Sequence, residues 1–141
     1  MYYYSAMPGL VGALVVIAVG YAIAFRRKGS ARNARIGVRH LELRTPVDPQ
    51  SVFDRIRMIG SPFKVDDADP QEKIVVLSTP VSFATWGFFY PVFIHADGTG
   101  SRIDLGIQSK FIQIGPIVGK KHRDCMRAIE AALSIPVARA I

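Results

Sequence analysis

The chain has 141 residues, a formal net charge of +7 and a single cysteine, Cys125. One cysteine excludes a disulfide within the chain and suits a reducing compartment, and the length leaves room for one modest hydrophobic core. Seven of the 18 Lys and Arg residues lie within residues 26–44, against one carboxylate. A nucleic-acid-binding domain usually carries its basic surface on the folded module instead, so the sequence predicts no nucleic-acid partner.

The first element is an uncharged apolar run over residues 8–25, directly followed by Arg26, Arg27 and Lys28. As a helix it would be about 27 Å long, close to the hydrocarbon core of a bilayer, about 30 Å. A cleaved signal peptide would carry its positive charge before the apolar stretch, so we predict a single-pass transmembrane helix. The positive-inside rule places residues 1–7 outside the inner (plasma) membrane and the remaining chain in the cytoplasm.

Small residues repeat along one stripe of this run. Gly9 and Ala13 are four residues apart, as are Gly20 and Ala24, and this spacing allows two helix backbones to approach closely. Because the pattern also arises by chance in membrane helices, two interpretations stay open. The stripe has no partner, or it contacts another integral membrane subunit or a second copy of the chain.

A basic segment with the composition of a flexible linker follows over residues 26–35. Its cations are expected to contact anionic lipid headgroups, and each contributes about 1 kcal/mol near such a surface. They are Arg26, Arg27, Lys28, Arg32 and Arg35.

Residues 36–135 are predicted to form one cytoplasmic α+β domain, with residues 136–141 as a tail. Its best-specified element is a helix with Asp48 as the N-cap and Pro49 at the first helical position. Alternating apolar and polar residues indicate the strands. The expected elements in chain order are strand 36–45, a helix from Pro49 to about Gly60, strands 63–66, 73–79, 83–95 and 103–111, and helix 117–133.

These elements predict a curved antiparallel sheet with both domain helices packed on one face. The order strand, helix, three or four strands, helix resembles that of a shortened helix-grip domain, or one half of a TATA-box-binding-protein-like fold. The resemblance lies in the order of elements alone and no motif accompanies it, so the sequence assigns no family.

An aromatic segment in the middle of the domain would place large side chains on both faces of its strand. Trp86, Phe88 and Tyr90 alternate with Phe89, and Phe93 lies on the side of Phe89. One face is expected to enter the core. The other requires a cover, which is either the domain's own helices and strands, a docked partner protein, an apolar ligand or the membrane.

Lys120, Lys121 and Arg123 crowd the first turns of the last predicted helix, where cations oppose the helix dipole. A bound anion or lipid headgroup would offset that cost, and solvated charge is the plainer interpretation. His122 and Cys125 are spaced three residues apart on the same helix. Because zinc sites need three or four protein ligands, no metal and no cofactor are predicted.

Three functions stay open. The leading hypothesis is a non-catalytic accessory or scaffold subunit of an inner-membrane complex, which docks through its cytoplasmic domain. The second is a membrane-tethered module that binds a lipid or another apolar ligand between the sheet and the last helix. The third is a small membrane-bound enzyme, although no nucleophile–base pair or catalytic carboxylate can be identified from spacing.

Overall fold

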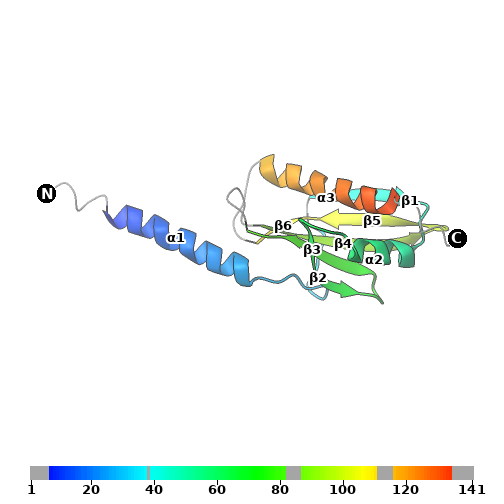
Figure 1. Cartoon of the computed structure of the whole chain (residues 1–141), viewed down its shortest axis with the longest axis horizontal. Coiled ribbons are helices and arrows are strands. Elements are labelled where there is room, and N and C mark those ends of the chain that lie inside the picture. The colour runs from blue at the N-terminus through cyan, green and yellow to red at the C-terminus, as the bar shows by residue number, and fades with distance from the viewer. Residues whose placement is uncertain (1–6, 38, 82–86, 111–115, 135–141) are drawn as a thin grey trace.

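The computed structural model describes residues 7–37, 39–81, 87–110 and 116–134 (Figure 1). Its strands form one antiparallel sheet with the order β1-β5-β4-β3-β2, and β6 pairs with β4. The strands are β1 (His40–Thr45), β2 (Lys64–Asp69), β3 (Ile74–Thr79), β4 (Phe88–Asp97), β5 (Gly100–Gly106) and β6 (Gln108–Ser109). The predicted strand 103–111 is therefore divided between β5 and β6, and Phe111 lies outside the described residues.

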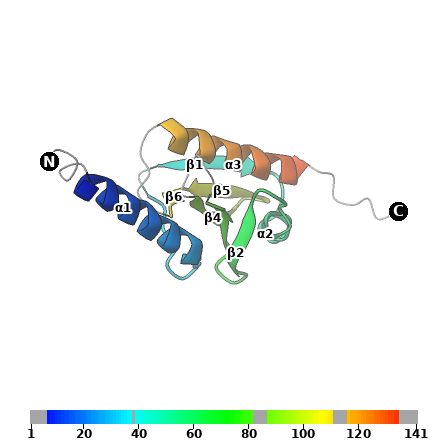
Figure 2. The ribbon, with the colours of Figure 1, turned by 60° about the vertical axis from the view of Figure 1, so that its left-hand side comes forward.

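Two helices, α2 (Pro49–Arg57) and α3 (Pro116–Ser134), pack on the same face of this sheet (Figure 2). The core between them contains Val52, Phe53, Ile56, Val75, Leu77, Phe88, Tyr90, Val92, Ile94, Ile103, Leu105, Cys125, Met126, Ile129 and Leu133. The small α+β domain with a curved antiparallel sheet and helices is thus confirmed.

The residues that predicted the start of α2 form the expected N-cap. The Asp48 carboxylate accepts a hydrogen bond from the Ser51 backbone N–H at 3.1 Å, and Pro49 occupies the first turn. The helix ends before the predicted Gly60, with Met58 as its C-cap. In α3 the predicted apolar stripe is also buried, from His122 through Leu133.

The N-terminal helix α1 (Met7–Arg26) projects away from the domain (Figures 1 and 2). Its large apolar side chains are exposed on every side; for example, Leu10, Val15 and Ile17 are 63, 54 and 48 % exposed. Within the described part of the chain, no helix has both the length and the apolar character needed to cross a membrane. This finding does not support the membrane span predicted over residues 8–25.

The small-residue stripe falls on α1. Gly9 and Ala13 are exposed and Gly20 is buried, whereas the side chain of Ala24 lies outside the described residues. The helix–helix contact predicted for this stripe stays a prediction.

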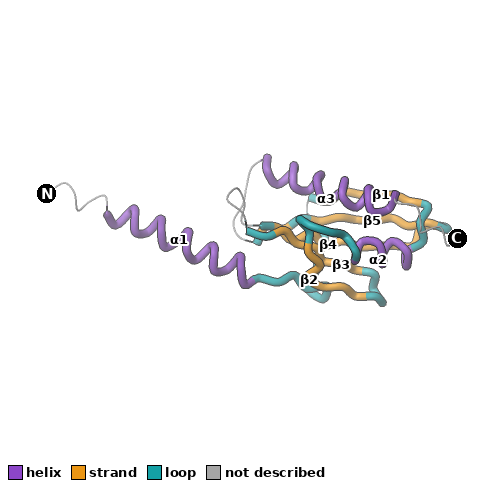
Figure 3. The backbone as a smooth tube through the Cα atoms, viewed as in Figure 1, coloured by secondary structure: helices purple, strands orange, loops and turns teal. Residues whose placement is uncertain are grey.

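Residues 27–35, which we call the strap, cross the outer face of the sheet, opposite α2 and α3 (Figure 3). The strap leaves α1 beside β2, the edge strand, and the chain then continues to β1 at the other edge. The backbone N–H groups of Gly29 and Ala31 donate to Asp66 and Asp67 of β2, each at 2.8 Å. We expected a flexible linker here, but the strap is held to the sheet by hydrogen bonds and by a small apolar cluster.

The strap also covers the second face of the aromatic segment. Phe88 and Tyr90 are fully buried in the main core, while Phe89 on the opposite face is 5 % exposed and packs with Ala31 and Val76. Phe93 is half-buried. This segment therefore does not present Phe88, Phe89 and Tyr90 as a free docking surface, because the domain and its own strap cover them. Trp86 lies outside the described residues.

Candidate functional site: a basic pocket at the end of the sheet

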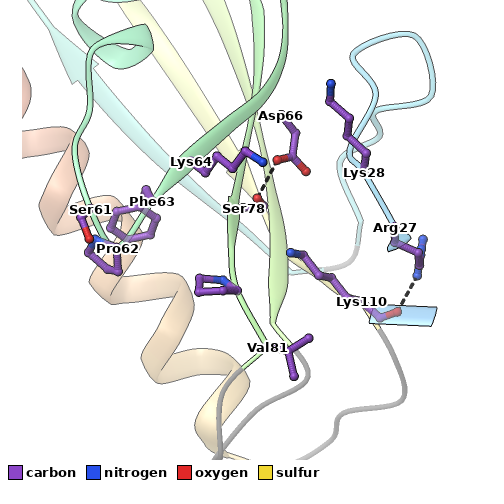
Figure 4. Close-up of a pocket in the computed structure, with 11 residues that line it drawn as sticks. Arg27, Lys28, Ser61, Pro62, Phe63, Lys64, Asp66, Ser78, Val81 and Lys110 are labelled. Carbon is purple, nitrogen blue, oxygen red and sulfur yellow. Dashed lines mark hydrogen bonds between the residues drawn. The ribbon is translucent and has the colours of Figure 1, made fainter. Parts of the chain in front are cut away.

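A pocket of about 600 Å³ opens where β2 begins and β3 ends, next to the strap (Figure 4). We call it the basic pocket. Four cations line it: Arg27, Lys28, Lys64 and Lys110. Its apolar wall is formed by Pro62, Phe63, Pro80 and Val81, and its remaining polar residues are Ser61, Asp66 and Ser78. Lys64 and Lys110 lie between Phe63 on one side and the strap on the other.

Among the described residues that line the basic pocket, Asp66 is the one carboxylate, and each of its oxygens accepts a hydrogen bond. Oδ1 accepts a hydrogen bond from Ser78 Oγ at 2.8 Å, and Oδ2 accepts the Gly29 N–H at 2.8 Å. The residue is buried. One negative charge therefore faces four positive charges, and its acceptor atoms already serve a hydroxyl and the strap backbone.

Lys110 is the most buried of the four cations, at 8 % exposure. Burial lowers the pKa of its ammonium, although Asp66 opposes the shift. Within the described part of the chain, its Nζ makes no hydrogen bond, and the ammonium lies 5.4 Å from the centre of the Phe89 ring. Because burial disfavours the charged form of the ammonium, an anion in the pocket would stabilise protonated Lys110.

The apolar wall is supported by the main core. Phe63 makes an edge-to-face contact with Tyr90, with ring centroids 5.6 Å apart and an interplanar angle of 76°. Burial raises the pKa of Tyr90 to about 12, and its hydroxyl lies 3.4 Å from Thr79 Oγ1. The wall is thus held by packed aromatic side chains on a rigid strand.

The space between the sheet and α3, where we expected an apolar ligand, contains fully buried side chains. Phe88, Tyr90, Ile103 and Leu105 from the sheet are between 0 and 1 % exposed, as is Cys125 from α3. The basic pocket instead lies at the end of the sheet, against the strap.

The cations predicted at the start of α3 do not join the basic pocket. Lys120 and Arg123 line a separate groove of about 530 Å³, while Lys121 is half-buried. Asp124 lies in the same groove, 3.7 Å from Lys120 Nζ and 3.9 Å from an Arg127 nitrogen. An acidic side chain thus partly neutralises this basic group, and headgroup contact there stays a prediction.

His122 and Cys125 are both buried in the main core rather than paired at a surface site. His122 Nε2 lies 2.7 Å from the Leu105 carbonyl oxygen, which can only accept, so Nε2 carries the proton. Burial raises the pKa of the Cys125 thiol and lowers that of His122. Among the described residues, no group of three or more His, Cys, Asp or Glu side chains could hold a metal ion.

His122 is expected to make the domain less stable at acidic pH. Its pKa is lowered in the folded state, so the unfolded chain takes up the proton first as the pH falls below about 6.5. The free energy of unfolding should therefore decrease from pH 7.5 to pH 5.5, which urea unfolding at both values would measure. His122→Gln should reduce this decrease; an identical decrease in the variant would assign it to other groups.

The residues of the basic pocket were not predicted from the sequence, except Arg27 and Lys28 as membrane contacts. Its lining comes from the strap and from the stretches 61–66, 78–81 and 110, which are far apart along the chain. Lys110 belongs to the polar positions of the predicted alternating strand 103–111, which would place it on the exposed face, so the sequence carried no signal for its burial.

The comparisons with known proteins show a fold and no family. No protein-family model matches the sequence, and neither does any curated protein. The structure resembles that of Ara h 8.0201 with a TM-score of 0.51 and 12 % sequence identity, over 67 % of this chain and 93 % of that one. It is also similar to TTHA0849 from Thermus thermophilus, with a TM-score of 0.43 and 12 % identity, over 67 and 92 % of the two chains. At this identity the likeness to Ara h 8.0201 concerns the fold alone.

Proposed function

We propose that this protein is a membrane-associated module that binds an anionic amphiphile, such as a lipid with a phosphate headgroup, in the basic pocket. The observation that carries the proposal is the combination of four cations and an apolar wall in one cavity. Its volume of about 600 Å³ falls within the range of about 300–1,000 Å³ that is usual for small-molecule sites.

The cations of the basic pocket would bind the negatively charged headgroup of the ligand. The Asp66 carboxylate accepts hydrogen bonds from Ser78 Oγ and from the Gly29 N–H, and among the described residues no hydrogen bond joins it to the Lys110 ammonium. A phosphate offers several acceptor oxygens, and hydrogen bonds between charged groups contribute about 1.5–3 kcal/mol each. The acidic headgroup would therefore lie at Lys64 and Lys110, and the first part of the acyl chain would lie against Phe63.

The N-terminal helix supports the membrane part of the proposal. The run over residues 8–25 has no charge and is followed by Arg26, Arg27 and Lys28. A helix that is apolar on all sides is normally covered by lipid or by other protein, and the large apolar side chains of α1 are exposed. We infer that α1 associates with the inner membrane and that the domain lies on its cytoplasmic side.

Binding can be measured on the full-length protein in mild detergent with three probes: dioctanoyl phosphatidic acid, dioctanoyl phosphatidylcholine and inorganic phosphate. We expect phosphatidic acid to bind and the zwitterionic lipid to bind much more weakly. Lys110→Gln should lower the affinity for phosphatidic acid by about tenfold or more. Arg44→Gln is the matched control, because it removes the same charge from an exposed residue paired with Glu42 and Asp97.

Two results would overturn the proposal. Equal affinities for the two lipids, or an unchanged affinity for phosphatidic acid in Lys110→Gln, would show that the cations do not contribute to binding. If inorganic phosphate binds as tightly as phosphatidic acid, the apolar wall does not contribute to affinity. That result would indicate a free anion as the ligand.

The accessory-subunit hypothesis remains as a second candidate because of one observation, the exposed apolar surface of α1 with its Gly9–Ala13 and Gly20–Ala24 spacings. In that case α1 packs against other integral membrane subunits or a second copy of the chain. Native mass spectrometry of the particle extracted in mild detergent tests this hypothesis. Stoichiometric membrane subunits would support it, and a monomer would exclude it.

A further inference from the structure

We propose that the strap and the anionic ligand bind to the domain cooperatively, with Asp66 and Asp67 as the positioning residues that hold the strap in place. The inference rests on the proposed function, since it concerns a ligand of the basic pocket. It adds that the pocket is complete only while the strap is docked, so that ligand binding and the attachment of α1 to the domain influence each other.

A β-bulge in β2 gives these two aspartates their common direction. The pairing of β2 with β3 shifts register between Val65 and Asp67, and an extra residue in one strand interrupts the alternation of faces. Val65 and Ala68 accordingly pack on the main core, whereas the carboxylates of Asp66 and Asp67 both bond to the strap on the outer face. Two consecutive carboxylates thus accept from alternate N–H groups of a single segment.

The strap fits closely against the sheet at Gly29. A Cβ at this position would lie 2.4 Å from Val76 Cγ1, 3.2 Å from the Phe89 ring and 3.3 Å from Asp66 Oδ2. Only glycine allows this approach without displacing a neighbour. Two residues later, Ala31 is 7 % exposed and packs with Val76 and Phe89.

The docked strap contributes two of the four cations of the pocket, Arg27 and Lys28. Arg27 also donates a hydrogen bond to the Lys110 carbonyl at 3.0 Å, and its guanidinium lies 5.1 Å from the centre of the Phe89 ring. If the strap leaves the sheet, the pocket loses these cations and the side that they form. Suppose that a ligand binds the pocket more tightly when the strap is docked than when it is released. By linkage, the bound ligand must then favour docking of the strap by the same factor.

The first measurement follows hydrogen exchange at the Ala31 amide in the full-length protein without ligand. Asp67→Ala removes its acceptor, and we expect exchange at Ala31 to become about tenfold faster. Asp69→Ala is the matched control: Asp69 lies on the same hairpin but accepts from Gln71 and Glu72, away from the strap. Unchanged exchange in Asp67→Ala would overturn the role of Asp67 in holding the strap.

The second measurement adds dioctanoyl phosphatidic acid. It should slow exchange at Ala31 in the wild-type protein, and Asp67→Ala should bind the lipid about tenfold more weakly while Asp69→Ala binds it normally. Gly29→Val changes the strap itself and leaves both aspartates intact. It should weaken binding of the lipid as Asp67→Ala does. If either variant shows fast exchange at Ala31 but still binds phosphatidic acid as tightly as the wild-type protein, the coupling is wrong. The proposed function would be unaffected by that result. No binding to the wild-type protein would overturn the proposed function and the coupling with it, whatever the first measurement gives for the strap.

Discussion

Replacing Phe53 with alanine is expected to lower the free energy of unfolding by about 3–5 kcal/mol. The side chain is 1 % exposed and belongs to the main core, where α2 packs on the sheet. Its ring also lies 5.4 Å from the Arg57 guanidinium carbon and 5.7 Å from Lys73 Nζ. Because domains of this size are stable by about 5–15 kcal/mol, the substitution should remove a large fraction of the total stability.

Urea unfolding followed by circular dichroism would measure the loss of stability in Phe53→Ala. Met58→Ala provides the control, since Met58 ends the same helix and is 83 % exposed; its stability should change by less than about 0.5 kcal/mol. A loss below about 1 kcal/mol in Phe53→Ala would contradict the packing of α2 on the sheet.

If α1 inserts into the membrane as proposed, replacing Val15 with aspartate should release the protein from membranes. Val15 lies in the middle of the uncharged run and is 54 % exposed. A charge at the centre of a membrane helix costs about 2.5–3.5 kcal/mol, which lowers the partition into the bilayer about a hundredfold. Flotation with vesicles of phosphatidylcholine and phosphatidic acid would measure the change, with Val15→Leu as the control of similar size and no charge.

The outcome for Val15→Asp also separates two modes of attachment. If the variant still floats with the vesicles but is released by high salt, the cations after α1 hold the protein to anionic lipid by electrostatic attraction. That result would contradict insertion of the apolar run. Full release at low salt would agree with insertion.

Much of the domain could be predicted from local signals in the sequence. The Asp48-Pro49 pair specified the start of α2 because an N-cap and a proline act within one turn of the chain. The buried stripe of α3 followed from helical periodicity. Each of these features depends on residues only a few positions apart.

The strap could not be predicted in this way. Its cations, glycine and small polar residues have the composition of a solvated linker, and the groups that hold it are backbone N–H groups whose partners lie 36 and 37 residues further along the chain. In a regularly alternating strand Asp66 and Asp67 would lie on opposite faces. The bulge that brings them to one face has no sequence signature here.

In the aromatic segment the sequence predicted one feature of the strand and could not predict another. Its two apolar faces correctly indicated that both would be covered, and Phe88 and Tyr90 do enter the core. The cover for Phe89 is the strap rather than a partner protein. Sequence periodicity identified the need for a cover, but it could not identify a segment that lies so far before this strand in the chain.

The burial of Cys125 has a practical consequence for all of these experiments. The only thiol of the chain is fully buried in α3, and burial raises its pKa, so a thiol reagent should reach it only after the domain opens. The rate at which Cys125 becomes labelled therefore reports directly on opening of the core. A second cysteine introduced at the buried strap position Ala31, by Ala31→Cys, would become accessible when the strap leaves the sheet. Comparison of the two labelling rates would then separate release of the strap from unfolding of the whole domain.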